Sequence, residues 1–187
     1  EMALYAVLQD SHSPAYFAEL ASREYNGSNR IKKSVSILNK LTEKNPLMDF
    51  LKNHKEVAVA SLRNKNDRAL LFTALICAAY PFGYDTTALL GKYFHVQDQV
   101  SSALIVQKMA GKYGSNRSLP NALYSVLPML IEAGIITRPV SGLYEMVRVK
   151  HYSNFVYEVY QRSFIVNNPT YTLSDEIESN SYFEFVN

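Results

Sequence analysis

The chain has 187 residues, enough for one domain with a substantial core that needs neither a disulfide nor a metal ion. Hydrophobic residues make up 48% of it and charged residues 19%, which excludes disorder over most of its length. With one cysteine, Cys77, it cannot form an intramolecular disulfide. The apolar run around Cys77 indicates a buried thiol in a reducing, cytoplasmic compartment rather than a catalytic nucleophile.

Charge is distributed unevenly along the chain, although the net charge is only +2. Residues 27–68 carry a net charge of +6 and residues 101–150 one of +4, whereas residues 1–26, 69–100 and 151–187 carry −3, −1 and −4. Two basic blocks inside an acidic frame indicate an anionic partner. Either block alone also fits the solvated face of a helix.

Residues 1–82 predict an N-terminal helical part. The pair Asn26-Gly27 is typical of a break between two helices. Asp67 is expected to cap a highly apolar helix, which Pro81 would end. The helices expected here cover residues 13–25, 28–44, 47–53 and 67–80, while residues 54–62 fit either a helix or a strand.

Residues 83–150 predict three helices and then a hairpin. Ser118 is expected to cap the third helix, and Gly134 to end it in a left-handed conformation. Residues 143–149 alternate with a period of two, as a half-buried strand does. The expected elements are helices over residues 86–94, 96–112 and 118–133, followed by strands over residues 135–138 and 143–149.

The C-terminal part, residues 151–187, predicts a further helix and then an acidic tail, and we expect all three parts to form one compact unit. The tail ends in Tyr182, Phe183 and Phe185, in a chain that has fourteen tyrosines. Tyrosine is favoured at interfaces. Residues 170–187 are therefore expected either to dock on a partner or a second copy, or to fold back onto the chain's own core.

The sequence predicts no catalytic, cofactor or metal site and no membrane segment. No glycine loop follows a strand in the way that phosphate binding requires, and no cysteine and histidine cluster has zinc spacing. The longest apolar run, residues 69–82, is too short to cross a bilayer. The carboxylates within residues 175–178 lie beside no histidine or nucleophile. We therefore expect a protein that is not an enzyme.

The stretch from residue 114 to residue 149 carries the strongest functional signal. It reads as a polar turn, a capped helix, a glycine stop and two short strands, around the phrase SLPNALYSVLPMLIEAGIITRP. This order resembles the winged-helix superfamily over residues 83–150. The resemblance implies a mainly helical, multi-helix fold with a winged-helix-like element, whose hairpin lies near residues 135–149. It also implies double-stranded DNA as the partner, with the third helix in the major groove and the hairpin on the backbone or in the minor groove.

In such a domain the third helix presents hydrogen-bond donors to base edges, and arginine and asparagine match the edges of guanine and adenine. Basic residues on neighbouring elements would position the DNA backbone, and the helix at residues 28–44 would extend the footprint. The candidates on the third helix are Arg117, Ser118, Asn121 and Tyr124, and the other candidates are Lys108, Lys112, Arg138, Arg30 and Lys33. Arg117 and Asn121 also suit a simple role in capping and solvating the helix.

The segments NPLMDFL and LIEAGII also resemble BrxA, the small helical protein of bacterial BREX phage-defence systems. That resemblance implies DNA binding within a multi-protein defence complex. The alternative function is a protein-interaction adaptor on the same scaffold, because many winged helices bind protein and use the third helix or the wing as a packing surface.

Overall fold

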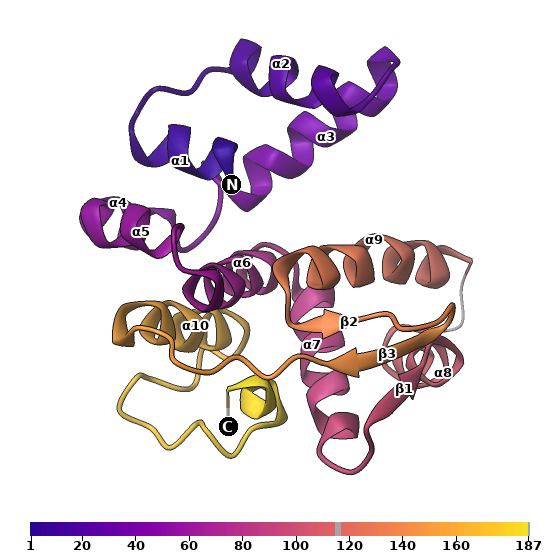
Figure 1. The fold of residues 1–187 in the computed structure, drawn as a ribbon. Coiled ribbons are helices and arrows are strands. Elements are labelled where there is room, and N and C mark those ends of the chain that lie inside the picture. Colours follow the sequence, from indigo (N-terminus) through magenta and orange to yellow (C-terminus); the bar gives the residue numbers. More distant parts are fainter. Residues whose placement is uncertain (115–116, 187) are drawn as a thin grey trace.

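The computed structural model of the chain describes residues 1–114 and 117–186, and Figure 1 shows its arrangement. The fold is mainly helical with a small antiparallel sheet, which confirms the predicted class. The first part holds α1 (Met2–Leu8), α2 (Pro14–Glu24), α3 (Ser28–Leu41), α4 (Met48–Asn53), α5 (Lys55–Ser61) and α6 (Lys65–Ala79). The second part holds α7 (Pro81–Phe94), β1 (Gln99–Ser101), α8 (Ser102–Tyr113), α9 (Ser118–Ala133), β2 (Ile136–Thr137), β3 (Leu143–Met146), α10 (Asn154–Asn167) and the 3-10 helix η1 (Ser181–Phe185).

The first helices follow local sequence signals. The Ser13 side chain caps α2 by accepting a hydrogen bond from a backbone N–H of its first turn at 3.1 Å. Gly27 has a φ of +99° and forms the turn into α3, a conformation that glycine adopts at little cost. α3 ends at Leu41, earlier than expected. Residues 54–62, which fitted neither period cleanly and could have been a helix or a strand, hold the helix α5.

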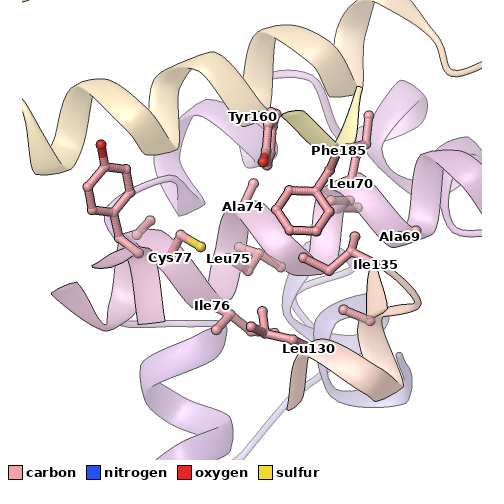
Figure 2. Packing of buried hydrophobic residues seen from close by; sticks show 14 of the residues in the cluster. Ala69, Leu70, Ala74, Leu75, Ile76, Cys77, Leu130, Ile135, Tyr160 and Phe185 are labelled. Carbon is pink, nitrogen blue, oxygen red and sulfur yellow. The ribbon is translucent and has the colours of Figure 1, made fainter. Parts of the chain in front are cut away.

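The core is built around α6, whose residues from Ala69 to Ala79 are nearly all buried. Figure 2 shows this helix packing among Leu130 of α9, Tyr160 of α10 and Phe185 of η1. A helix that is apolar all round belongs at the centre of a core. Cys77 lies on α6 and is fully buried, and burial raises the pKa of its thiol to about 11, as expected for an unreactive structural cysteine.

α6 begins earlier than predicted because Asn64, and not Asp67, caps it. The Oδ1 atom of Asn64 accepts hydrogen bonds from the backbone N–H groups of Asn66 and Asp67, at 2.8 and 3.1 Å. Asp67 lies inside the first turn, and its Oδ1 accepts a hydrogen bond from the backbone N–H of Ser153 at 2.7 Å. Because Ser153 caps α10, this carboxylate ties the start of α6 to the start of α10.

The predicted end of α6 before Pro81 is confirmed, but the next helix begins at Pro81 and not at residue 86. The chain turns at Tyr80, which has an extended backbone, and Pro81 is the first residue of α7. Proline suits this position because the N–H that it lacks has no partner in a first helical turn. Gly83 lies inside α7, where the helix approaches a side chain of α6 closely.

The single helix predicted over residues 96–112 is also wrong, because β1 occupies its first turn. Val100 is buried in β1 and pairs with Tyr144 of β3. The Ser101 side chain then caps α8 by accepting a hydrogen bond from the backbone N–H of Leu104 at 3.2 Å. A strand of three residues is too short to show a period, and its partner strand follows only after two further helices.

Within the described residues, three strands form an antiparallel sheet in the order β1-β3-β2. Ile136 of β2 pairs with Met146 of β3, so the hairpin predicted near residues 135–149 is confirmed, with shorter strands than expected. Gly134 ends α9 with a φ of +91°, in the left-handed conformation that was predicted for it. Figure 1 shows the sheet lying alongside α9 as a small wing.

The end of the chain packs into the core. Tyr182, Phe183 and Phe185 are all 0% exposed. The Tyr160 hydroxyl donates a hydrogen bond to the backbone carbonyl oxygen of Tyr182 at 2.6 Å. Gly91 of α7 allows η1 to approach, because a Cβ at that position would lie 1.9 Å from the carbonyl oxygen of the first residue of η1. The aromatic end of the tail therefore folds back onto the chain's own core.

Candidate nucleic-acid-binding surface

α9 has a buried face and an exposed face. The apolar residues of its buried face, Leu119, Leu123, Val126, Leu127 and Leu130, pack into the core. Arg117, Ser118, Asn121 and Tyr124 are exposed, and the Tyr124 side chain is 72% exposed. The structure therefore leaves these four candidates accessible to solvent along one helix.

The end of α8 is fixed to α7 by a carboxylate, which affects one of its two candidate lysines. The Lys112 Nζ lies 2.6 Å from Oδ1 of Asp85, and the Tyr113 hydroxyl donates a hydrogen bond to Oδ2 of the same carboxylate. Burial, and then the hydrogen bond to Asp85, raise the pKa of Tyr113. Lys112 is thus partly neutralised, whereas Lys108 is exposed and forms no ion pair with a described residue.

The wing carries the candidate Arg138 at its exposed side. Its Nη2 donates a hydrogen bond to the hydroxyl of Ser141 at 2.9 Å. Gly142, with a φ of +82°, completes the turn, and its carbonyl oxygen accepts a hydrogen bond from the backbone N–H of Ser102 at 2.8 Å. This bond attaches the wing to the start of α8, so that Arg138 is presented from a supported turn.

A groove separates α3 from α9, and the candidates Arg30 and Lys33 line it. The groove has a volume of about 850 Å³, and Ser125 and Met129 of α9 lie on its other wall. The structure thus brings the two basic residues of α3 to a surface that α9 shares, although they lie far from α9 in the sequence.

No sequence pattern predicted this groove. Its lining includes Phe72 of α6 and Met129 of α9. The residues that line the groove belong mainly to α1, α3, α6 and α9. Local periodicity carries no information on which helices become neighbours. These lining residues are recognised by the partial exposure of their apolar side chains, which only the folded structure shows.

The described residues carry no group of three or more histidine, cysteine, aspartate and glutamate side chains that could hold a metal ion. The histidines stay apart from one another: His12 lies 3.6 Å from Glu43, and His95 lies 3.1 Å from Glu184. None of the helices in the described part of the chain combines the length and apolar character that a bilayer crossing requires.

No protein-family model, no curated protein and no solved structure matches this chain.

Proposed function

We propose that this chain is a non-enzymatic protein that binds double-stranded DNA through α9 and the β2–β3 wing. The order of elements from α7 to β3 carries the proposal. Helix, strand, two helices and a hairpin follow one another, and β1 pairs beside β3 in the sheet. This order supports the winged-helix proposal, in which α7, α8 and α9 are the three helices.

α9 is the element proposed to enter the major groove, which is wide enough to admit one α-helix. Its exposed residues include Arg117 and Asn121, whose side chains have the donor geometry to read guanine and adenine. Tyr124 adds an exposed ring on the same helix. Lys108 of α8 and Arg138 of the wing lie on elements that flank α9 and would contact phosphates.

The basic residues of α3 extend this footprint. Arg30 and Lys33 face the groove beside α9, and neither forms an ion pair with any described residue. Cations without partners are available to replace the counterions of DNA, so binding should weaken steeply as salt is raised. The resemblance to BrxA adds a proposed setting, a bacterial phage-defence or regulatory complex in the cytoplasm.

The test is fluorescence anisotropy with a labelled random duplex of about 30 base pairs, titrated across a salt series. We expect micromolar or tighter binding with a steep negative salt slope. Arg117→Ala and Asn121→Ala should each weaken binding by about 1–3 kcal/mol if these residues read bases. Arg63→Ala removes an exposed cation from the end of α5 and is the matched control for charge. Absence of binding at low salt would reject the proposal.

A protein-interaction adaptor is the second candidate, and one surface favours it. Met2, Tyr5 and Tyr25 are about half exposed, at 52%, 49% and 47%. All three line a hollow of about 960 Å³ between α1, α2, α3 and α5. Large apolar side chains gathered around one hollow are typical of interaction sites. Self-association measured by sedimentation, and abolished by Tyr5→Glu, would support this candidate. A chain that stays monomeric would leave only a different protein as its partner.

A further inference from the structure

The groove between α3, α6 and α9 changes character along its length. On α3 the lining residues recur every three or four positions, so that one face of the helix forms the wall. This face begins with Arg30, Lys33 and Ser34 and continues with apolar residues to Leu41. The groove is thus polar and basic beside the first turns of α3. Beside the last turns of α3 it is apolar.

The basic end is open to an anion. Arg30 and Lys33 are exposed and lack an ion-pair partner among the described residues. Arg68, the third cation of the groove, is engaged, because its guanidinium lies 3.7 Å from the Glu1 carboxylate. Glu132 of α9 also lines the groove. Arg30 and Lys33 are therefore the groove cations that remain available to an anionic group.

The apolar end is incompletely covered by the protein itself. None of the residues of α3, all of which are described, is buried. Leu38 and Leu41 of α3 and Phe72 of α6 are only partly buried, although they pack at the edge of the core. Met129 of α9 completes this apolar lining. A ligand that covers this apolar surface would therefore gain binding free energy.

The C-terminal end of α3, which forms one wall of the groove, is fixed to α6. Contacts at this end hold α3 in place and keep the groove open. The Asn45 side chain is buried, and its Nδ2 donates a hydrogen bond to the carbonyl oxygen of Leu75 in α6 at 2.9 Å. Its Oδ1 accepts one from the backbone N–H of Leu47 at 3.1 Å. The Lys40 ammonium also lies over the Tyr80 ring, 4.3 Å from its centre. These contacts fix the connection between α3 and α6.

We propose that this groove binds a small amphipathic anion, with its anionic group between Arg30 and Lys33 and its apolar chain directed towards Leu41. The volume of about 850 Å³ lies within the range of small-molecule sites, which are mostly apolar with a few polar groups that set orientation. The ligand site shares Arg30 and Lys33 with the proposed DNA-binding surface. The expected effect of the ligand on DNA binding therefore rests on the proposed function. Because the ligand would occupy the basic residues that contact phosphate, it would weaken DNA binding.

The first experiment uses three probes that share a ten-carbon chain: decanoate, decanol and decylammonium, each below its micelle-forming concentration. Isothermal titration calorimetry on the full chain without DNA should show one site for decanoate. We expect decanol to bind about tenfold more weakly, equivalent to ~1.4 kcal/mol, and decylammonium more weakly still. Equal affinity for the three probes, or no binding of decanoate, would overturn the proposal.

Variants assign the site. Arg30→Gln combined with Lys33→Gln should weaken decanoate binding about tenfold, a loss of ~1.4 kcal/mol. Lys32→Gln combined with Lys44→Gln removes the same charge from exposed residues that do not line the groove, and should leave binding unchanged. Met129→Glu should weaken binding through the apolar end. If both double variants lower affinity equally, decanoate responds to overall charge and the groove assignment is wrong.

Two further measurements separate the other outcomes. If sedimentation shows a dimer that Met129→Glu dissociates, a second copy fills the groove and the small-ligand proposal is wrong. Anisotropy with labelled duplex should then be repeated with and without decanoate, and a rise in the DNA dissociation constant is expected. Failure of DNA binding alone would reject the proposed function, while decanoate binding, measured without DNA, would still stand.

Discussion

η1 and α3 are opposites in the way that they use apolar residues. η1 has five residues, and three of them, Tyr182, Phe183 and Phe185, are completely buried. α3 has fourteen residues, and none of these described residues is buried. The short element therefore completes the core, whereas the long one lies over a groove. Apolar surface in η1 is removed from solvent and contributes to the stability of the fold, whereas apolar surface in α3 stays partly exposed.

The largest effect is expected from Tyr182→Ala. Its ring stacks on Tyr160, with centroids 4.4 Å apart, and its hydroxyl lies 2.6 Å from that of Ser163. Removal of a fully buried aromatic ring should lower the free energy of unfolding by about 3–5 kcal/mol, because the cavity cannot collapse in a packed core. Urea denaturation followed by circular dichroism measures this. A loss below about 1 kcal/mol would show that η1 is not part of the core.

Gly91→Ala tests the contact between η1 and α7. The new Cβ would lie 1.9 Å from a backbone carbonyl oxygen, so η1 would have to move. We expect the free energy of unfolding to fall by about 3 kcal/mol. Gly111→Ala is the matched control, because Gly111 lies in α8 with no described atom within 4 Å of the added Cβ. That control should be neutral or stabilising by up to ~1 kcal/mol. Equal effects would contradict the close approach.

Alkaline pH should weaken the same core. The pKa of Cys77 rises on folding from 9.0 to about 11 because its thiol is desolvated. Below pH 9 both states keep the proton, but above it the unfolded chain releases the proton first, so the free energy of unfolding falls as pH rises towards 11. The expected loss is about 2 kcal/mol. Urea denaturation from pH 8 to pH 10.5 measures it, and Cys77→Ala should show a shallower decline, since only the buried tyrosines remain.

The smallest effect is expected on α3. Ile37 lines the groove and is only partly buried, so Ile37→Ala should lower the free energy of unfolding by less than ~1 kcal/mol. Leu70→Ala, at a fully buried site on α6, should lower it by about 2–5 kcal/mol and is the comparison within the same chain. Similar losses in the two variants, measured by urea denaturation, would mean that α3 shares the core and that the contrast with η1 is wrong.

Local signals predicted the elements that local chemistry determines. The α9 helix, its end at Gly134 and the hairpin after it follow from a stripe of apolar residues, a left-handed glycine and a period of two. β1 was missed because Val100 becomes part of a strand only through pairing with Tyr144. Pro81 was interpreted as a helix end, although proline is equally suited to the first turn of the next helix.

On the candidate surface, features set within one helix were predictable, and features set by contacts between helices were not. The exposure of Asn121 and Tyr124 follows from the apolar stripe on the other face of α9. The engagement of Lys112 by Asp85 does not, because it depends on how α7 and α8 pack. Nor could the sequence place Arg30 in the same groove as α9, since that groove arises from the tertiary arrangement of several helices. The exposure of the α9 residues was therefore predictable. Whether a basic residue is paired, and which helix it faces, was not.

The contact between η1 and α7 also sets an order of events while the chain is being made. The Ser181 hydroxyl donates a hydrogen bond to the carbonyl oxygen of Ala88 at 2.9 Å, across a separation of 93 residues. A ribosome adds about 5–20 residues per second, so η1 is synthesised roughly 5–20 s after the part of α7 that it covers. During that interval the face of α7 around Leu90 and Phe94 lacks its cover. Until η1 is synthesised, the newly made chain therefore exposes an apolar face of α7 that the finished protein buries.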